Sequence, residues 1–209
     1  MRKIAWLIVV IFFSATTTQA QDTYPRVEVF AGYSYADVKL SGFRGVPRTH
    51  GHGWATSFTY NLHKHFGLTA DFAGQYGTVT EHAFSEVTQR TEARDLEFNA
   101  HQFLFGPRFT LRRDRLTAFA HTLVGAFRRW KAGFGPSGIF VPMPASFPGL
   151  SGTHFSLALG GGLDIRSNNR VSIRVIQFDY LPVQGGLDSE RWRHNLRLQT
   201  GFVFKFGVS

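Results

Sequence analysis

Residues 54–62 read WATSFTYNL and residues 66–76 read FGLTADFAGQY, and both stretches alternate apolar or aromatic residues with small or polar ones. Trp54, Phe58 and Tyr60 therefore share one face of the first stretch, and Phe66, Phe72 and Tyr76 share one face of the second. A period of two is typical of β-strands and excludes an amphipathic helix. The polar residues 63–65 lie between the two stretches, so this region predicts a β-hairpin.

The same alternation recurs and predicts eight strands in all. The other six cover residues 27–40, 96–111, 116–130, 155–166, 171–183 and 195–206. In the strand over 171–183 the alternation of apolar and polar residues shifts by one position near Ile176, which predicts a β-bulge. The face on which Asp179 lies depends on this bulge. The pattern does not assign the faces of the strand over 116–130. Each strand is long enough for the roughly 9 to 11 tilted residues that cross a membrane.

The segments between the predicted strands alternate between short and long. Residues 63–65, 112–115 and 167–170 are short links, whereas residues 41–53, 78–95, 131–153 and 184–191 are longer and rich in Gly, Pro and polar residues. Outer-membrane barrels have short periplasmic turns and long external loops. A soluble barrel puts its apolar residues inside, but here the polar face carries few Lys and Glu and suits a narrow lumen. The sequence therefore predicts an all-β fold, an eight-stranded antiparallel up-and-down transmembrane β-barrel.

The N-terminal residues have the layout of an export signal. Arg2 and Lys3 precede an apolar run over residues 4–13, and a polar stretch ends at Ala20. We expect residues 1–20 to be a cleaved signal peptide and residues 21–209 to be one outer-membrane β-barrel domain. Removal of the signal lowers the formal net charge from +9 to +7, because it takes away two basic residues. An exported basic chain meets phosphate on lipid and lipopolysaccharide, so nucleic acid is not an expected partner.

Several short motifs, in this order, resemble the small outer-membrane β-barrel family that includes the transmembrane domain of OmpA. They are EVFAGYSY at 28–35, FGLTADF at 66–72, FLFGPR at 103–108, GGGLD at 160–164, QFDYL at 177–181 and NLRL at 195–198. The resemblance covers almost all of residues 21–209 and implies an outer-membrane barrel. It also implies recognition of the last strand by the outer-membrane assembly machinery. Such barrels often end on an aromatic residue, whereas here Gly207, Val208 and Ser209 follow Phe206.

Charged residues fall on the predicted lumen face and have both signs. Buried charges need partners, so we expect an ionic and hydrogen-bonded network in the lumen. An eight-stranded barrel is just wide enough for side chains to fill it, which favours a closed plug over the alternative, a narrow ion or small-solute channel. The residues predicted for this network are Asp71, Arg108, Asp164, Arg166, Arg174, Asp179 and Arg197, with Lys205 on the same face.

The outer end of the barrel carries the other candidate sites. Arg128, Arg129, Trp130 and Lys131 form a predicted external basic and aromatic edge, which suits contact with an anionic glycolipid or an ordinary solvated strand end. The apolar loop over 131–153 is a candidate for partner binding or for a lid. We therefore predict a structural or interaction role through external loops, with an unknown external partner.

Enzymatic and metal chemistry are weaker interpretations. His154 and Ser156 share a strand face, as in lipid A deacylases of similar fold, but no acidic residue stands at an obvious place to orient the histidine. The pairs His50 and His52, and His63 and His65, lack a nearby third ligand. The absence of cysteine excludes disulfides, thiolate zinc sites and cysteine nucleophiles. No catalytic residue, cofactor or metal is therefore predicted.

Overall fold

The computed structural model describes residues 24–38, 48–85, 90–133, 152–185 and 191–208. No helix within these ranges is long and apolar enough to cross a membrane. The described chain forms strands β1 (Pro25–Val38), β2 (Thr49–His63), β3 (Phe66–Ser85), β4 (Arg90–Arg113), β5 (Leu116–Gly133), β6 (Gly152–Arg166), β7 (Val171–Gln184) and β8 (Trp192–Val208).

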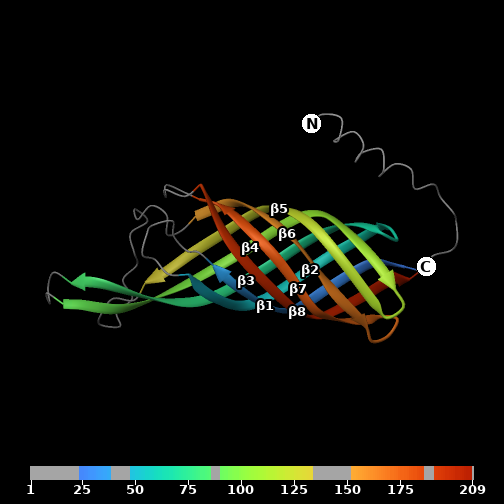
Figure 1. Ribbon diagram of the computed structural model, residues 1–209, viewed down its shortest axis with the longest axis horizontal. Helices are drawn as coiled ribbons and strands as arrows, with labels where there is room; N and C mark the ends of the chain where they lie inside the picture. The colour runs from blue at the N-terminus through green and yellow to red at the C-terminus, as the bar shows by residue number, and fades with distance from the viewer. Residues whose placement is uncertain (1–23, 39–47, 86–89, 134–151, 186–190, 209) are drawn as a thin grey trace, which may run out of the picture.

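The eight strands form one closed barrel in sequence order, and every neighbouring pair is antiparallel. β1 closes the barrel by pairing with β8, from Pro25 opposite Val208 to Asp37 opposite Leu196. Figure 1 shows the connections 64–65, 114–115 and 167–170 at the right-hand end of the barrel, with the start of β1 and the end of β8. We call this the turn end and the opposite end the loop end. The predicted fold class is confirmed.

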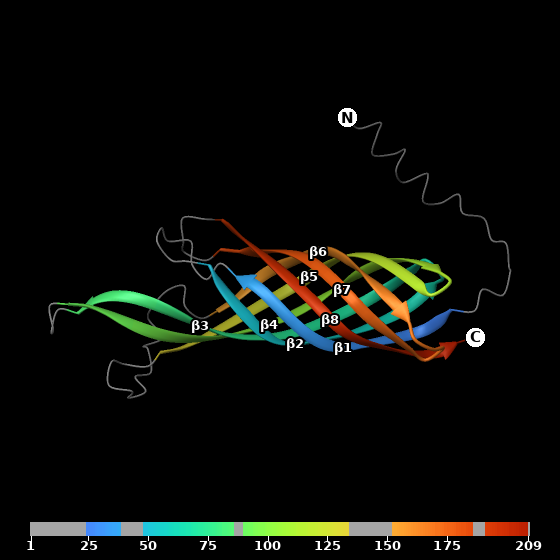
Figure 2. The same ribbon diagram turned by 60° about the horizontal axis from the view of Figure 1, so that its bottom comes forward.

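The main difference from the sequence prediction lies between β3 and β4. Residues 78–95 were expected to be a loop, but the two strands stay paired from Thr78 opposite Glu97 to Ser85 opposite Arg90. Figures 1 and 2 show this hairpin extending well beyond the other strands at the loop end. The sequence of this region lacks the apolar alternation that marks the other strands, so its pairing was not predicted.

The barrel is apolar outside and polar inside. Large side chains such as Trp54, Phe58 and Phe105 are between 44 and 54% exposed, whereas Arg174, Asp179 and Arg197 are 0 to 1% exposed. A soluble protein rarely exposes a contiguous apolar surface of this extent, whereas a membrane barrel presents one to lipid. The face composition therefore places the outward side chains against lipid.

The structure assigns the faces of β5, which the pattern left open. Thr117, Phe119, His121, Leu123 and Phe127 are buried inside, and Thr122 and Val124 face outward. Phenylalanine is thus present on both faces, with Phe30 of β1 also 1% exposed inside the barrel.

The predicted bulge in β7 is confirmed. The register between β7 and β8 shifts between Arg174 and Gln177, so Val175 and Ile176 both face outward. Because of this shift, Arg174, Gln177 and Asp179 all face the lumen.

Candidate functional site in the barrel lumen

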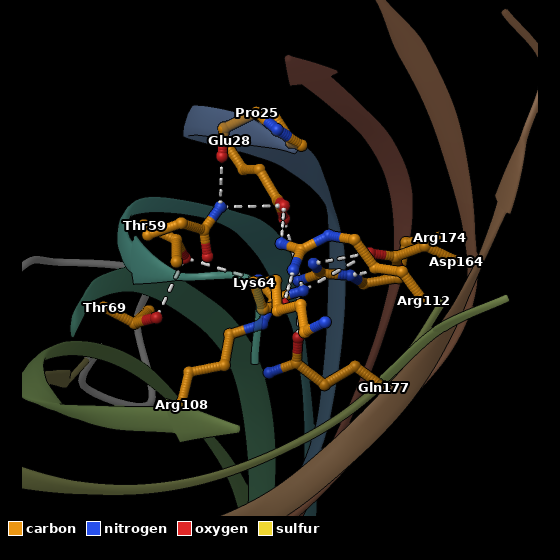
Figure 3. A network of polar contacts seen from close by, with 11 residues as sticks. Pro25, Glu28, Thr59, Lys64, Thr69, Arg108, Arg112, Asp164, Arg174 and Gln177 are labelled. Carbon is orange, nitrogen blue, oxygen red and sulfur yellow. Dashed lines mark hydrogen bonds and ion pairs between the residues drawn. The ribbon is translucent and has the colours of Figure 1, made fainter. Parts of the chain in front are cut away.

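A cluster of charged side chains fills the lumen near the turn end (Figure 3). Glu28 of β1 accepts a hydrogen bond from Arg112 Nη2 at 2.6 Å and lies 3.4 Å from Arg108 Nη2. Asp164 of β6 accepts from Arg174 Nε at 2.8 Å and pairs with Arg108 Nη2 at 3.5 Å. Arg108 of β4 thus lies between two carboxylates that come from β1 and β6.

Polar groups complete the surroundings of Glu28. Asn61 Nδ2 donates to Glu28 Oε1 at 3.1 Å and to the carbonyl oxygen of Pro25 at 2.8 Å. Arg112 also donates to the carbonyl oxygen of Lys64 in the first turn. The carboxylate is 2% exposed, so these partners replace the water that it loses on burial.

A second cluster lies next to the first, toward the loop end, and is centred on Arg197 of β8. Its Nη1 donates to Asp71 at 2.8 Å and to Gln102 at 2.9 Å, and its Nη2 donates to Asp179 at 2.7 Å. His121 Nε2 lies 2.8 Å from the other oxygen of Asp179. Arg197 therefore bridges carboxylates on β3 and β7 across the lumen.

Gln177 joins the two clusters into one network. Its side-chain oxygen accepts from Arg174 Nη1 at 2.7 Å, and its Nε2 donates to Asp179 at 2.9 Å. Across both clusters, four guanidinium groups are ion-paired with four carboxylates, so the charges of these eight groups balance: Arg108, Arg112, Arg174 and Arg197 with Glu28, Asp71, Asp164 and Asp179. This balance suits a fixed plug, because each charged group of these two clusters has an opposite charge beside it.

Two inward-facing phenylalanines support the guanidinium groups. The Arg108 guanidinium lies 3.9 Å from the ring centroid of Phe119, and that of Arg174 lies 4.4 Å from Phe119 and 4.3 Å from Phe30. Glycines make room for the rings, since a Cβ at Gly162 would lie 2.8 Å from Phe119 and a Cβ at Gly32 would lie 2.8 Å from Phe30. The network is thus stacked on aromatic rings as well as hydrogen-bonded.

Replacing Phe119 with Leu should lower the free energy of unfolding by about 2 kcal/mol, because two desolvated guanidinium groups lose their aromatic partner. Urea unfolding of the refolded barrel in detergent micelles measures this change. Phe109→Leu is the matched control, since Phe109 is exposed on the lipid face, and its effect should stay within about 0.5 kcal/mol. Equal effects of the two substitutions would contradict the stacking role.

The part of the lumen nearest the loop end holds both apolar and polar side chains, and Ser34, Gln75 and Asn195 are among the buried polar ones. One cluster of buried side chains there comprises Ala36, Val38, Ala100, Phe127 and Val183, and another comprises Leu104, Leu123, Ala158 and Leu181. Arg129 and Arg193 are also buried at this end, each 1% exposed. Apolar side chains therefore lie between the ionic network and the loops.

The structure brings together six of the seven residues expected in the lumen network. Asp71, Arg108, Asp164, Arg174, Asp179 and Arg197 all face inward and are at most 2% exposed. Arg166 does not join them. It is exposed at the end of β6, where it donates to the carbonyl oxygen of Asp114 in the neighbouring turn. Alternation along β6 predicted that Arg166 faces the lumen, but Arg166 is the last residue of the strand and its side chain lies at the end of the barrel.

The expected external basic edge is divided between the two faces of β5. Arg128 is exposed, whereas Arg129 is buried in the lumen, because successive residues of a strand point to opposite faces. The side chains of Trp130 and Lys131 lie outside the described part of the structure, as do residues 134–151 of the apolar loop. The same holds for the expected signal peptide at residues 1–20.

Sequence reasoning missed Glu28, Arg112 and His121 as members of the network. Glu28 could have been found from the sequence, because it alternates with residues of β1 that face outward. This alternation places its side chain in the lumen. Arg112 lies next to the turn and reaches back into the lumen, which no pattern reveals. His121 was missed because the faces of β5 could not be assigned.

The residues considered for catalysis and metal binding have other partners. Ser156 is 0% exposed in the lumen, and its hydroxyl donates to the carbonyl oxygens of Pro182 and Leu157, each at 3.4 Å. His50 Nδ1 hydrogen-bonds to the Tyr35 hydroxyl at 2.7 Å, and His52 bonds to Tyr33. The described residues contain no group of three or more His, Cys, Asp or Glu placed to hold a metal ion.

Comparisons with known proteins identify the fold. No protein-family model and no curated protein matches the sequence. Neisserial surface protein A (NspA) matches the structure with a TM-score of 0.60 and 12% identity, over 86% of this chain and 97% of that one. Ail, the attachment invasion locus protein of Yersinia pestis, crystallised with the heparin analogue sucrose octasulfate, matches with a TM-score of 0.52 and 18% identity, over 85% and 97%. The chain thus has the fold of small outer-membrane β-barrels, as the sequence resemblance predicted.

Proposed function

We propose that this protein is an outer-membrane β-barrel with a plugged lumen, whose role is structural and interactive and is carried by its loop end. The observation that carries the proposal is the charge balance of the lumen network, in which four guanidinium groups pair with four carboxylates. Ions that crossed the barrel would have to displace these pairs and then pass the apolar side chains beyond them. The lumen is thus better built to hold the strands together than to conduct.

The loop end offers the surface for interaction. The paired ribbon of β3 and β4 projects beyond the barrel, and two-stranded ribbons leave backbone groups at their edges that a partner strand can pair with. Arg128 is exposed on β5 nearby, and the chain has an excess of basic residues. Surface glycolipid and anionic macromolecules are therefore the proposed partners. The sulfated saccharide bound to Ail has the same anionic chemistry.

Planar-bilayer recording separates the plug from the alternative, a narrow ion or small-solute channel. We expect the folded barrel to insert and remain silent, while a porin in the same bilayers gives conductance steps. Folding is checked before recording, because a closed barrel migrates differently on a gel before and after boiling. Steady conductance steps from correctly folded protein would overturn the plug.

We propose no enzymatic activity. The lumen position of Ser156 supports this, because an acyl substrate would reach the barrel from the lipid side. Incubation with lipid A and mass spectrometry of the product tests it, and deacylation that is lost in Ser156→Ala would instead favour the lipid A-modifying enzyme.

Export and assembly complete the proposal. We expect cleavage after Ala20, delivery of residues 21–209 to the outer membrane, and insertion by the outer-membrane assembly machinery. The N-terminus of protein isolated from outer membranes, determined by mass spectrometry, should begin at Gln21. An intact Met1 in membrane-inserted protein would contradict cleavage.

A further inference from the structure

A groove lies on the lipid-facing surface where β1, β7 and β8 meet. It has a volume of about 270 Å³ and is lined mainly by Tyr33 and Tyr35 of β1, Val175 and Ile176 of β7, and Leu198 and Thr200 of β8. Most of these side chains are apolar and exposed, so the groove opens toward the membrane and not toward the lumen. The membrane would supply an acyl chain to fill this groove.

The β7 bulge and one small side chain build the groove. The bulge turns both Val175 and Ile176 outward and forms one wall. Thr200 is smaller than Leu198 and Phe202, the outward-facing residues on either side of it in β8. Its hydroxyl donates to the carbonyl oxygen of Arg174 at 2.9 Å, at the start of the bulge. Because this bond engages the hydroxyl, the polar atom of Thr200 is satisfied without a partner in the groove.

Three tyrosine–histidine pairs surround the groove on its loop-end side, and we call them the Tyr–His pairs. Tyr33 pairs with His52 and Tyr35 with His50 between β1 and β2, and Tyr180 pairs with His194 between β7 and β8. In each pair the tyrosine hydroxyl bonds to histidine Nδ1, and all three histidines are exposed. Aromatic residues at this position are typical of the boundary between lipid tails and headgroups.

The Tyr–His pairs orient hydrogen-bond donors toward that boundary. When the hydroxyl donates to Nδ1, the proton of a neutral imidazole is on Nε2, and a protonated ring also carries one there. Nε2 is then a donor for an acceptor outside the protein. Arg48 lies beside the pairs, since its Nη1 donates to the carbonyl oxygen of His194 at 3.1 Å while its Nε bonds to Asp37. His50 on β2, preceded by Arg48, and His194 on β8 lie on the two sides of β1, which suits a wide headgroup with several acceptors.

We propose that the groove binds one acyl chain of an outer-leaflet phosphorylated glycolipid, with its phosphates and sugar oxygens accepting hydrogen bonds from His50, His194 and Arg48. The inference deepens the proposed glycolipid contact and rests on it, but it assigns the contact to a site different from the basic strand end at Arg128. The apolar wall recognises the chain, and the Tyr–His pairs recognise the headgroup.

Filling the groove tests the acyl-chain part. Thr200→Phe should reduce lipid A binding about tenfold, as read from native mass spectra of the refolded barrel titrated with lipid A in detergent micelles. Thr122→Phe is the matched control, because Thr122 is also an outward-facing threonine but lies on β5, away from the groove, and its binding should be unchanged. If Thr200→Phe fails to fold, Leu198→Trp fills the same groove without touching the hydrogen bond at the bulge. Unchanged binding in a folded groove-filled variant would overturn the site.

Removing the donors tests the headgroup part. The double variant His50→Phe and His194→Phe should weaken lipid A binding about tenfold but leave the weaker binding of phosphatidylglycerol unchanged. Equal binding of the two lipids to the unsubstituted protein would overturn the choice of glycolipid over phospholipid. Glycolipid binding that depends on Arg128 and not on Thr200 would support the proposed function while overturning this site.

Discussion

Replacing Arg197 with Met is expected to lower the free energy of unfolding by about 3–5 kcal/mol, the largest effect of any single substitution considered for this barrel. Arg197 is 0% exposed and is the ion-pair partner of both Asp71 and Asp179. Met fills a similar volume but leaves two buried carboxylates without their cation. Asp179 keeps His121 at 2.8 Å, whereas Asp71 loses Arg197, its ion-pair partner among the described residues.

Matched variants separate loss of charge pairing from loss of volume. The triple variant Arg197→Met, Asp71→Asn and Asp179→Asn removes the unpaired charges and should recover more than half of the lost stability. Arg48→Met makes the same change in an exposed pair with Asp37, 2.8 Å long, and should cost no more than about 1 kcal/mol. Urea unfolding in micelles, followed by tryptophan fluorescence, measures all three. An Arg197→Met effect as small as that of Arg48→Met would contradict the plug.

Phe105→Arg is expected to lower the free energy of unfolding by about 2–4 kcal/mol, because it places a charge in the middle of the lipid-facing band. Phe105 is 54% exposed on β4, and the outward residues of that strand run from His101 near the loop end to Leu111 near the turn end. Phe105 lies midway between them, where an arginine side chain is farthest from both interfaces. The substitution thus tests which face meets lipid.

Depth provides the control for this prediction. His52→Arg introduces the same side chain on the same face, but at the loop-end boundary, and should cost only about 0–1 kcal/mol. The two variants are compared by urea unfolding in phospholipid vesicles. A soluble barrel would tolerate both substitutions equally, so equal costs would contradict the membrane orientation of the faces.

The sequence predicted strand positions well wherever one face meets lipid and the other meets the lumen. Residues 54–62 and 66–76 lie in β2 and β3, and the shift in alternation near Ile176 is the bulge in β7. The loop prediction over 78–95 was wrong for residues 78–85 and 90–95, which continue the strands beyond the barrel. The sequence there shows no alternation of polarity that would mark the pairing.

The lumen network could also be predicted where the strands alternate clearly between apolar and polar residues. Asp71, Asp164 and Arg197 lie on clearly alternating strands, so their inward position was readable from the sequence. The inward positions of Phe119 and Phe30 were not predicted. The pattern left the faces of the strand over 116–130 open, and Phe30 shares the phase of Glu28, which was also missed. Inside the barrel these rings stack on guanidinium groups in space left by Gly162 and Gly32, and that space depends on which residues the neighbouring strands bring opposite.

The sequence by itself determined the strands, their alternating faces and the membrane barrel that they form, because alternation is a property of local chain geometry. Only the tertiary structure decided that Glu28 pairs with Arg112, that Arg197 bridges Asp71 and Asp179, and that a groove opens at Thr200. These contacts join residues that are distant in the chain, and they depend on the register and closure of all eight strands. Period-two alternation fixes which way a side chain points, but not which side chain it meets.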